Sequence, residues 1–431
     1  MTRQGAIYYA IVAALLIMVG FLQSWNVALG IFNLCLISAI MALGVNIQWG
    51  YAGLFNVGIM GFAALGGMSA MLVSMPPVAD AWAAGGSGIA FAALSLVAVV
   101  IGVILVRKFS PPNLRLAATV VTVLVGLVLI RSVYDPAVEA IEAVNPAHTG
   151  YLGGLGLPIV LAWVVGGIVA AGAAWLIGKI SLGLRADYLA IATLGISEII
   201  IAVLKYEEWL TRGVKNVTGL PRPVPYEIDL MESDGFGTFA ALFGSDIDDA
   251  ASVVVKLSYA ALFLIVLAII MWLSQRALHS PWGRMMRAIR DNRDAASAMG
   301  KDVTHRHLQV FVLGCAVCGV AGAMLTTLDG QLTPTSYIPL RYTFLIWVMV
   351  IIGGSGNNWG AILGGFVIWF LWIEAEPLGN GLMNLITFAM QDGYWLKDHL
   401  IASAAYTRLV LMGGILLVVM RFAPRGMIPE R

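Results

Sequence analysis

Four arginines at three-residue spacing form the most unusual feature of this sequence. Arg284, Arg287, Arg290 and Arg293 lie in the stretch SPWGRMMRAIRDNRDAASAMG, whose surroundings are almost entirely apolar. Residues three apart share one face of a helix, so these guanidinium groups form a polar surface. Such a surface orients contact with a groove on another protein, or it lies on anionic lipid headgroups.

The same stretch predicts a helix with recognisable ends. Ser280 followed by proline is typical of an N-cap and a first turn. Asp294 is followed by a run of small residues that includes Ala295 and Ala296. Small side chains permit close approach to another surface. Gly300 is a typical C-terminal stop signal. We therefore expect one amphipathic helix over the whole stretch.

No catalytic or metal-binding pattern accompanies the arginines. The phosphate loop G-x-x-x-x-G-K-[ST] is missing, and the glycine-rich stretch 353–360 contains no lysine to hold ATP. The motifs H-E-x-x-H and G-x-S-x-G are missing too. We therefore predict a protein that is not an enzyme and that binds no metal and no cofactor of its own.

The elements that carry these residues are long apolar helices. Hydrophobic residues make up 60% of the chain and charged residues 11%, against roughly 25% charged in a soluble domain. About 20 apolar residues cross the hydrocarbon layer as a helix. Such runs lie at 6–22, 27–47, 51–75, 88–106, 117–134, 157–178, 187–205, 255–274, 308–328, 338–353, 359–374 and 404–421.

We predict an all-α, polytopic membrane protein with about 10–12 membrane helices, some of them short or broken, in a single domain over 1–431. The short runs 338–353 and 359–374 could together form one re-entrant unit. The balance of 25 basic and 24 acidic residues leaves no excess of positive charge for nucleic acid.

Charge placement predicts the orientation. With a cytoplasmic N-terminus, most Lys and Arg residues fall on the cytoplasmic side and the acidic loops fall outside. This places both termini and the arginine-rich loop 276–307 in the cytoplasm. The polar, acidic segment 206–254 then forms an exterior loop, either a solvated linker or a docking surface.

Polar residues interrupt the apolar runs at three places. Irregular backbone at membrane depth needs protein or a water-filled cavity to satisfy it, so broken helices often mark a path through the membrane. The first two interruptions are equally explained as tight turns with glycines for close helix contact. The candidates for a path are Asn46, Gln48 and Asn56, then Ser355 and Asn357, then Thr193, Ser197 and Glu198.

Glu198 is the carboxylate that we place inside a membrane helix. A charge at that depth normally faces a cavity or a charged partner. A lining or coupling role, an ion pair or subunit contact, and a position nearer the membrane surface all remain open.

Several motifs together resemble the LivM-type permeases of branched-chain amino acid importers. Asp294-Ala295-Ala296 followed by Gly300 is similar to the "EAA…G" loop of bacterial ATP-binding-cassette (ABC) permeases, with Asp in place of Glu. The stretches GYAGLFNVG from Gly50, RADYLAIATLG from 185 and IGGSG with WGAILGG between 352 and 365 resemble the same family.

The resemblance implies a permease for branched-chain or other hydrophobic amino acids in a bacterial inner membrane. It implies as partners a second homologous permease, two ABC ATPases that use ATP and Mg, a periplasmic substrate-binding protein and membrane lipid. Contact with the ATPases is expected at Arg284, Arg287, Arg290, Asp294, Ala295, Ala296 and Gly300.

Two alternatives remain. Permeases for urea or short-chain amides belong to the same family, and the amides of Asn46, Gln48 and Asn56 would suit such a solute. A gradient-driven secondary transporter, with Glu198 carrying a proton, is the alternative from another class.

Overall fold

Long apolar helices account for most of the structure, a computed structural model that describes residues 3–233, 235–242, 246–388, 390 and 395–430. Within these residues nine helical segments are long and apolar enough to cross a membrane. Their helices are α1 (Arg3–Leu22), α2 (Trp25–Val45) with η1 (Asn46–Gly50), α5 (Ser87–Phe109), α6 (Arg115–Glu142), α7 (Ile159–Ser181), α8 (Ala186–Tyr206), α12 (Ile247–His279), α15 (Val303–Asp329) and α17 (Asn358–Thr387).

Four further helices complete the apolar set among the described residues. α3 (Ile59–Ser74) and α16 (Pro339–Gly353) are shorter, and α18 (Trp395–Ala402) with α19 (Thr407–Phe422) forms a bent pair. Each predicted apolar run overlaps one of these helices, so the all-α polytopic fold is confirmed. The run 51–75 is irregular over 53–58 and continues as α3 from Ile59, and α17 is long enough to span without α16.

Short elements connect the long helices. Val217 pairs with Leu332 in a two-stranded antiparallel sheet. The short elements are α4 (Ala79–Ala81), η2 (Trp82–Gly86), α9 (Glu208–Thr211), η3 (Gly213–Lys215), β1 (Val217–Thr218), α10 (Glu227–Met231), α11 (Phe236–Leu242), α13 (Pro281–Asp291), α14 (Arg293–Ala298), β2 (Gln331–Leu332), η4 (Pro334–Ser336) and η5 (Ala404–Tyr406).

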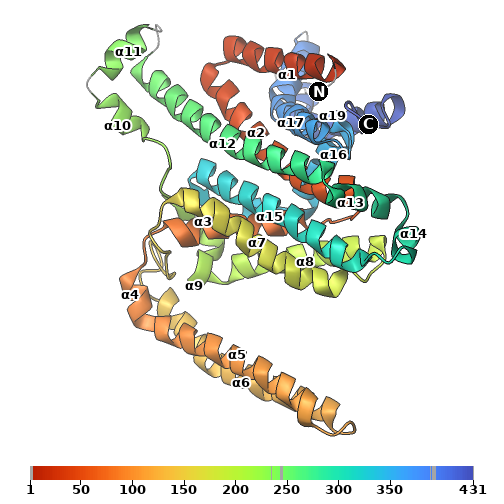
Figure 1. Ribbon diagram of the computed structural model, residues 1–431. Helices are drawn as coiled ribbons and strands as arrows, with labels where there is room; N and C mark the ends of the chain where they lie inside the picture. Colours follow the sequence, from red (N-terminus) through yellow and green to blue (C-terminus); the bar gives the residue numbers. More distant parts are fainter. Residues whose placement is uncertain (1–2, 234, 243–245, 389, 391–394, 431) are drawn as a thin grey trace.

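The helices pack in two groups that meet at α2 and α15. α15 packs against α3 and α7, whereas α2 packs against α12 and α17 (Figure 1). A Cβ atom added at Gly66 would overlap the carbonyl oxygen of Gly319. Small residues allow this close backbone approach, which is typical of membrane helix interfaces.

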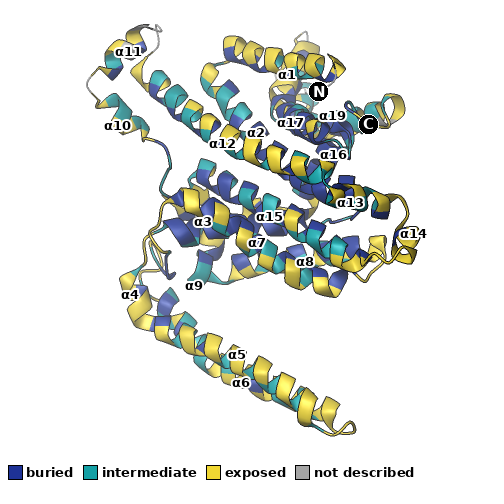
Figure 2. Cartoon of the chain, in the orientation of Figure 1, coloured by how far each residue is buried: buried dark blue, intermediate teal, exposed yellow. Residues whose placement is uncertain are grey.

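The pair α5 and α6 projects away from both groups. The two helices pack along each other, and their side chains are mostly exposed (Figure 2). Leu94, Val100 and Leu124 are among the exposed apolar residues. A surface of this kind is expected of helices surrounded by lipid.

The arginine-rich segment and the acidic segment lie at opposite ends of the molecule. α13, α14 and both chain termini are at one end, and α10 and α11 are at the other (Figure 1). α12 begins inside the predicted loop 206–254 and ends inside 276–307, so both loops are shorter than predicted. The assignment of one end to the cytoplasm stays a prediction.

Candidate functional site

The arginine-rich stretch forms two helices rather than the single one predicted. Ser280 Oγ accepts a hydrogen bond from the Gly283 amide at 3.3 Å and caps α13. Asn292 is extended, and its side chain accepts the Ala295 amide at 2.9 Å to start α14. Asparagine is a strong N-cap, so it ends one helix and begins the next. Gly300 has φ +77° and stops α14, as predicted.

α13 is amphipathic and is fixed to the membrane helices. Met286 and Ile289 are buried against the helix bundle, whereas Arg284 is exposed. Trp282 Nε1 donates to Gln309 Oε1 of α15 at 3.2 Å. These contacts anchor α13 to the first turns of α15.

α14 presents small and apolar side chains to the exterior. Asp294 and Ala295 are exposed, Met299 is 80% exposed, and only Ala296 of the small-residue run is buried. This is the combination that close docking of another protein requires, because small side chains let the partner's backbone approach.

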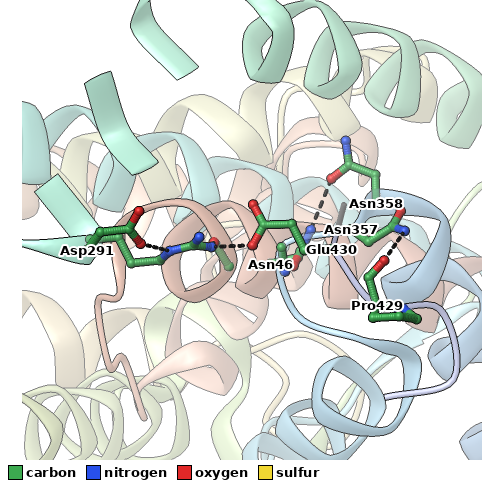
Figure 3. Close-up of polar contacts among 9 residues, drawn as sticks. Asn46, Asp291, Asn357, Asn358, Pro429 and Glu430 are labelled. Carbon is green, nitrogen blue, oxygen red and sulfur yellow. Dashed lines mark hydrogen bonds and ion pairs between the residues drawn. The ribbon is translucent and has the colours of Figure 1, made fainter. Parts of the chain in front are cut away.

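Arg290 differs from its neighbours because it points back into the molecule. Its guanidinium lies 2.8 Å from Glu430 and 3.3 Å from Asp291, the two carboxylates labelled in Figure 3. It also donates to the carbonyl oxygen of Gly50. The side chain is only 26% exposed. Arg290 therefore ties α13 to the break after α2, whereas we had expected it to face a partner.

The two predicted helix breaks meet beside Arg290. Asn46 Oδ1 accepts the Gly356 amide at 2.8 Å, and Asn46 Nδ2 donates to Asn358 Oδ1 at 3.0 Å (Figure 3). Tyr51 also donates its hydroxyl to Asn358 Oδ1. A Cβ atom added at Gly50 would lie 2.5 Å from the Gly356 nitrogen. Glycine at position 50 lets the broken segments touch, and glycine at position 356 leaves room for the Glu430 carboxylate.

A second amide pair lies deeper along the same break. Asn56 Nδ2 donates to Gln48 Oε1 at 2.9 Å, and both amides lie 3.5 Å from Cys315 Sγ. Thr193 Oγ1 accepts the Val57 amide at 3.0 Å. These side chains join α2, α8 and α15, and in this conformation their polar groups face one another.

The remaining predicted path residues differ in position. Ser197 is fully buried against Gly61, and Ser355 is half-buried in the turn between α16 and α17. Asn357 caps α17 by accepting the Trp359 amide at 3.1 Å. Glu198 is exposed on α8. The structure thus places most of the candidates in polar contacts at and around the two helix breaks, and it leaves Glu198 outside them.

The C-terminal segment is a part of these contacts that we did not predict. The amides of Met427 and Ile428 donate to the carbonyls of Ile352 and Gly353 at 2.8 and 2.9 Å. Asn357 Nδ2 donates to the Pro429 carbonyl at 3.2 Å (Figure 3). With Glu430 on Arg290, the segment joins the end of α16 to α13. In the sequence, only the apolar pair Met427 and Ile428 close to the acidic Glu430 could have indicated that this segment packs against the helices.

A buried carboxylate was also missed. Glu374 of α17 is 5% exposed, and its Oε2 accepts Gln23 Nε2 at 2.8 Å. It stands at the last position of the predicted run 359–374, where it looked like a boundary residue. α17 in fact continues to Thr387, so the carboxylate lies in mid-helix.

A cavity of about 270 Å³ lies between α2, α3, α15, α16 and α17. None of the predicted path residues lines it. Its walls are Leu34, Ile37, Ser38, Met41, Met60, Leu325, Thr326, Asp329, Gln331, Thr333, Ser336, Tyr337, Tyr342, Ile346 and Trp369.

Apolar helices broken at buried amides, with a polar helix pair at one end, define a polytopic membrane protein of the permease class. A profile described as "branched-chain amino acid transport system / permease component" matches residues 116–420. The chain belongs to this family.

The relatives found include three permeases named LivM. The chain is 28% identical to the high-affinity branched-chain amino acid transport system permease protein LivM of Salmonella typhimurium and 27% identical to that of Escherichia coli. Each alignment covers 67% of this chain and 61% of the relative. A probable LivM of Methanocaldococcus jannaschii is 24% identical over 68% of this chain and 73% of that protein. No solved structure matches the chain.

Proposed function

We propose that the chain is the permease subunit of an ABC importer for branched-chain amino acids. The family and the names of the LivM relatives support the substrate class. A LivH permease of Escherichia coli is 27% identical over 26% of this chain, which supports a second, homologous permease as partner. The protein is located in a bacterial inner membrane, and both of its termini are in the cytoplasm.

One observation carries the coupling mechanism. α14 exposes the motif Asp294-Ala295-Ala296, whereas α13 next to it is tied through Arg290 to both helix breaks. A partner ATPase that binds α14 and displaces it therefore also displaces the ends of α2 and α16. Rigid elements that connect two sites in this way couple a two-state change.

The energy source lies outside this chain. Two ATPase subunits bind ATP and Mg and hydrolyse the nucleotide, and a periplasmic binding protein delivers the solute to the end that carries α10 and α11. The permease itself breaks no covalent bond. The permease alternates between a conformation in which the path is open to the outside and one in which it is open to the cytoplasm.

The gradient-driven alternative lacks support at its candidate residue. Proton coupling needs a titratable group on the path. Glu198 is exposed on α8 and is not among the residues that line the cavity. Of the amides favoured for a urea path, Asn56 is hydrogen-bonded to Gln48 and Asn46 to Asn358, and none of them lines the cavity.

The proposal is tested by reconstitution. The permease, its partner permease, the ATPases and the binding protein are placed in proteoliposomes, and uptake of labelled leucine and labelled urea is measured. We expect leucine uptake only with ATP inside the compartment that holds the ATPases. Uptake driven by a proton gradient without ATP, or uptake of urea alone, would refute the proposal.

A further inference from the structure

The cavity between α2 and α16 combines apolar walls with a single charge. Leu34, Ile37 and Met41 of α2 and Ile346 of α16 form its apolar side. Among the described residues that line it, Asp329 has the only ionisable carboxylate. At about 270 Å³ the cavity is close to the smallest sites that hold small molecules, roughly 300 Å³.

Asp329 has no counter-ion in the part of the chain that the structure describes. No hydrogen bond or ion pair to its side chain is found there. Asp329 is also the last residue of α15, where the helix dipole disfavours a negative charge. Arg341 of α16 stacks on the Trp372 ring at 4.9 Å and does not line the cavity. Asp329 is exposed where it borders the cavity, so its carboxylate is accessible to a cationic group of a solute.

Two hydrogen-bond donors on the walls are unsatisfied as well. Trp369 Nε1 and Thr333 Oγ1 are buried and have no hydrogen-bond partner among the described residues. These two groups become available to a polar ligand only after small side-chain movements that open them to the cavity. Tyr337, in contrast, is satisfied by Thr326 at 2.8 Å.

We propose that this cavity holds an aliphatic amino acid in transit, with its α-ammonium group on Asp329. The branched side chain lies on Leu34, Ile37 and Met41, and the α-carboxylate is directed to Thr333 and Trp369. This inference rests on the proposed function and assigns its substrate a place in the membrane. A neutral solute such as urea cannot neutralise Asp329, so the charge favours amino acids over amides.

Cysteine protection tests the site directly. Ser336 is exposed at the cavity wall, whereas Cys35, Cys315 and Cys318 are buried, so a maleimide labels S336C in the assembled transporter with little background. Leucine and leucinamide both carry the ammonium group, and 4-methylpentanoate lacks it. We expect the first two to slow labelling and the third to have no effect.

The charge is tested by replacing Asp329 in the S336C background. D329N should raise the leucine concentration that half-protects the cysteine by at least about tenfold, because it removes the charge that the ammonium group pairs with. D329E keeps the charge and should retain protection. D80N, a change at an exposed carboxylate outside the cavity, is the matched control and should leave protection unchanged.

Leucine uptake by the same S336C preparation separates two failures. If leucine is imported but 4-methylpentanoate protects equally, or protection is missing or unaffected by D329N, the site is refuted and the permease function stands. If no amino acid is imported while the complex is intact, the proposed function itself is refuted, and the site with it.

Discussion

The guanidinium of Arg290 lies 2.8 Å from the carboxylate of Glu430, so the amphipathic helix α13 and the last described residue of the chain are held together. Arg290 also donates to the carbonyl of Gly50, and Asn357 holds Pro429. A displacement of α13 is therefore passed to the breaks after α2 and α16 at the same time.

Breaking this ion pair should slow transport. Both side chains are about a quarter exposed, so we expect E430Q to remove about 1 kcal/mol of coupling and to lower the uptake rate about fivefold. Membrane insertion should be normal. The charge-swapped pair R290E with E430R should recover part of the uptake lost in R290E alone. Equal uptake by the unmodified protein, E430Q, R290E and the charge-swapped double variant would show that the ion pair contributes nothing to coupling.

Substitutions at Gly300 distinguish the effect of backbone strain from the effect of contact with a partner. Its φ of +77° suits glycine and asparagine, and an added Cβ atom would meet nothing within 4 Å in this chain. We expect G300N to retain uptake, whereas G300V strains the backbone by roughly 1–2 kcal/mol and reduces uptake. If G300N is as inactive as G300V, a docked partner must fill the space beside Gly300.

The contact between the two breaks should contribute to stability. In G50A the new methyl group meets the Gly356 nitrogen and Asn46, and overpacking of this kind costs roughly 1–3 kcal/mol. The thermal midpoint of the detergent-solubilised protein should fall by several degrees. G172A is the control, because nothing lies within 4 Å of the added atom and alanine favours the helix. An unchanged midpoint in G50A would mean that the breaks separate easily.

Glu198 distinguishes an ATP-driven importer from a gradient-driven carrier. The residue is exposed on α8, so E198Q should leave ATP-dependent leucine uptake and its pH profile unchanged. Loss of uptake in E198Q, together with loss of dependence on a proton gradient, would favour the secondary transporter.

The helices and the two helix breaks could be predicted from sequence because their signals are local. Apolar runs of membrane length and clusters of glycine with asparagine stand out without knowledge of the fold. Ser280 and Gly300 marked the ends of the arginine-rich stretch in the same way. Asn292 was overlooked as a cap because the arginine spacing continues across it.

The features that we missed depend on contacts distant in sequence. Arg290 has the same spacing as Arg284 and Arg287, and only the fold turns it toward Glu430, 140 positions further along the chain. The same holds for the cavity, which draws its walls from five helices. Asp329 directly follows the predicted run 308–328, and its place beside the α2 residues of the cavity depends on how the helices pack.

The central claim is that an ATPase subunit binds directly to α14. A photo-crosslinking residue at the exposed position of Ala295, in cells that also express the partner subunits, tests this directly. We predict a crosslink to the ATPase, and none to it from Leu96 on the exposed surface of α5. Capture of lipid alone at position 295, with the ATPases present in the purified complex, would contradict the claim.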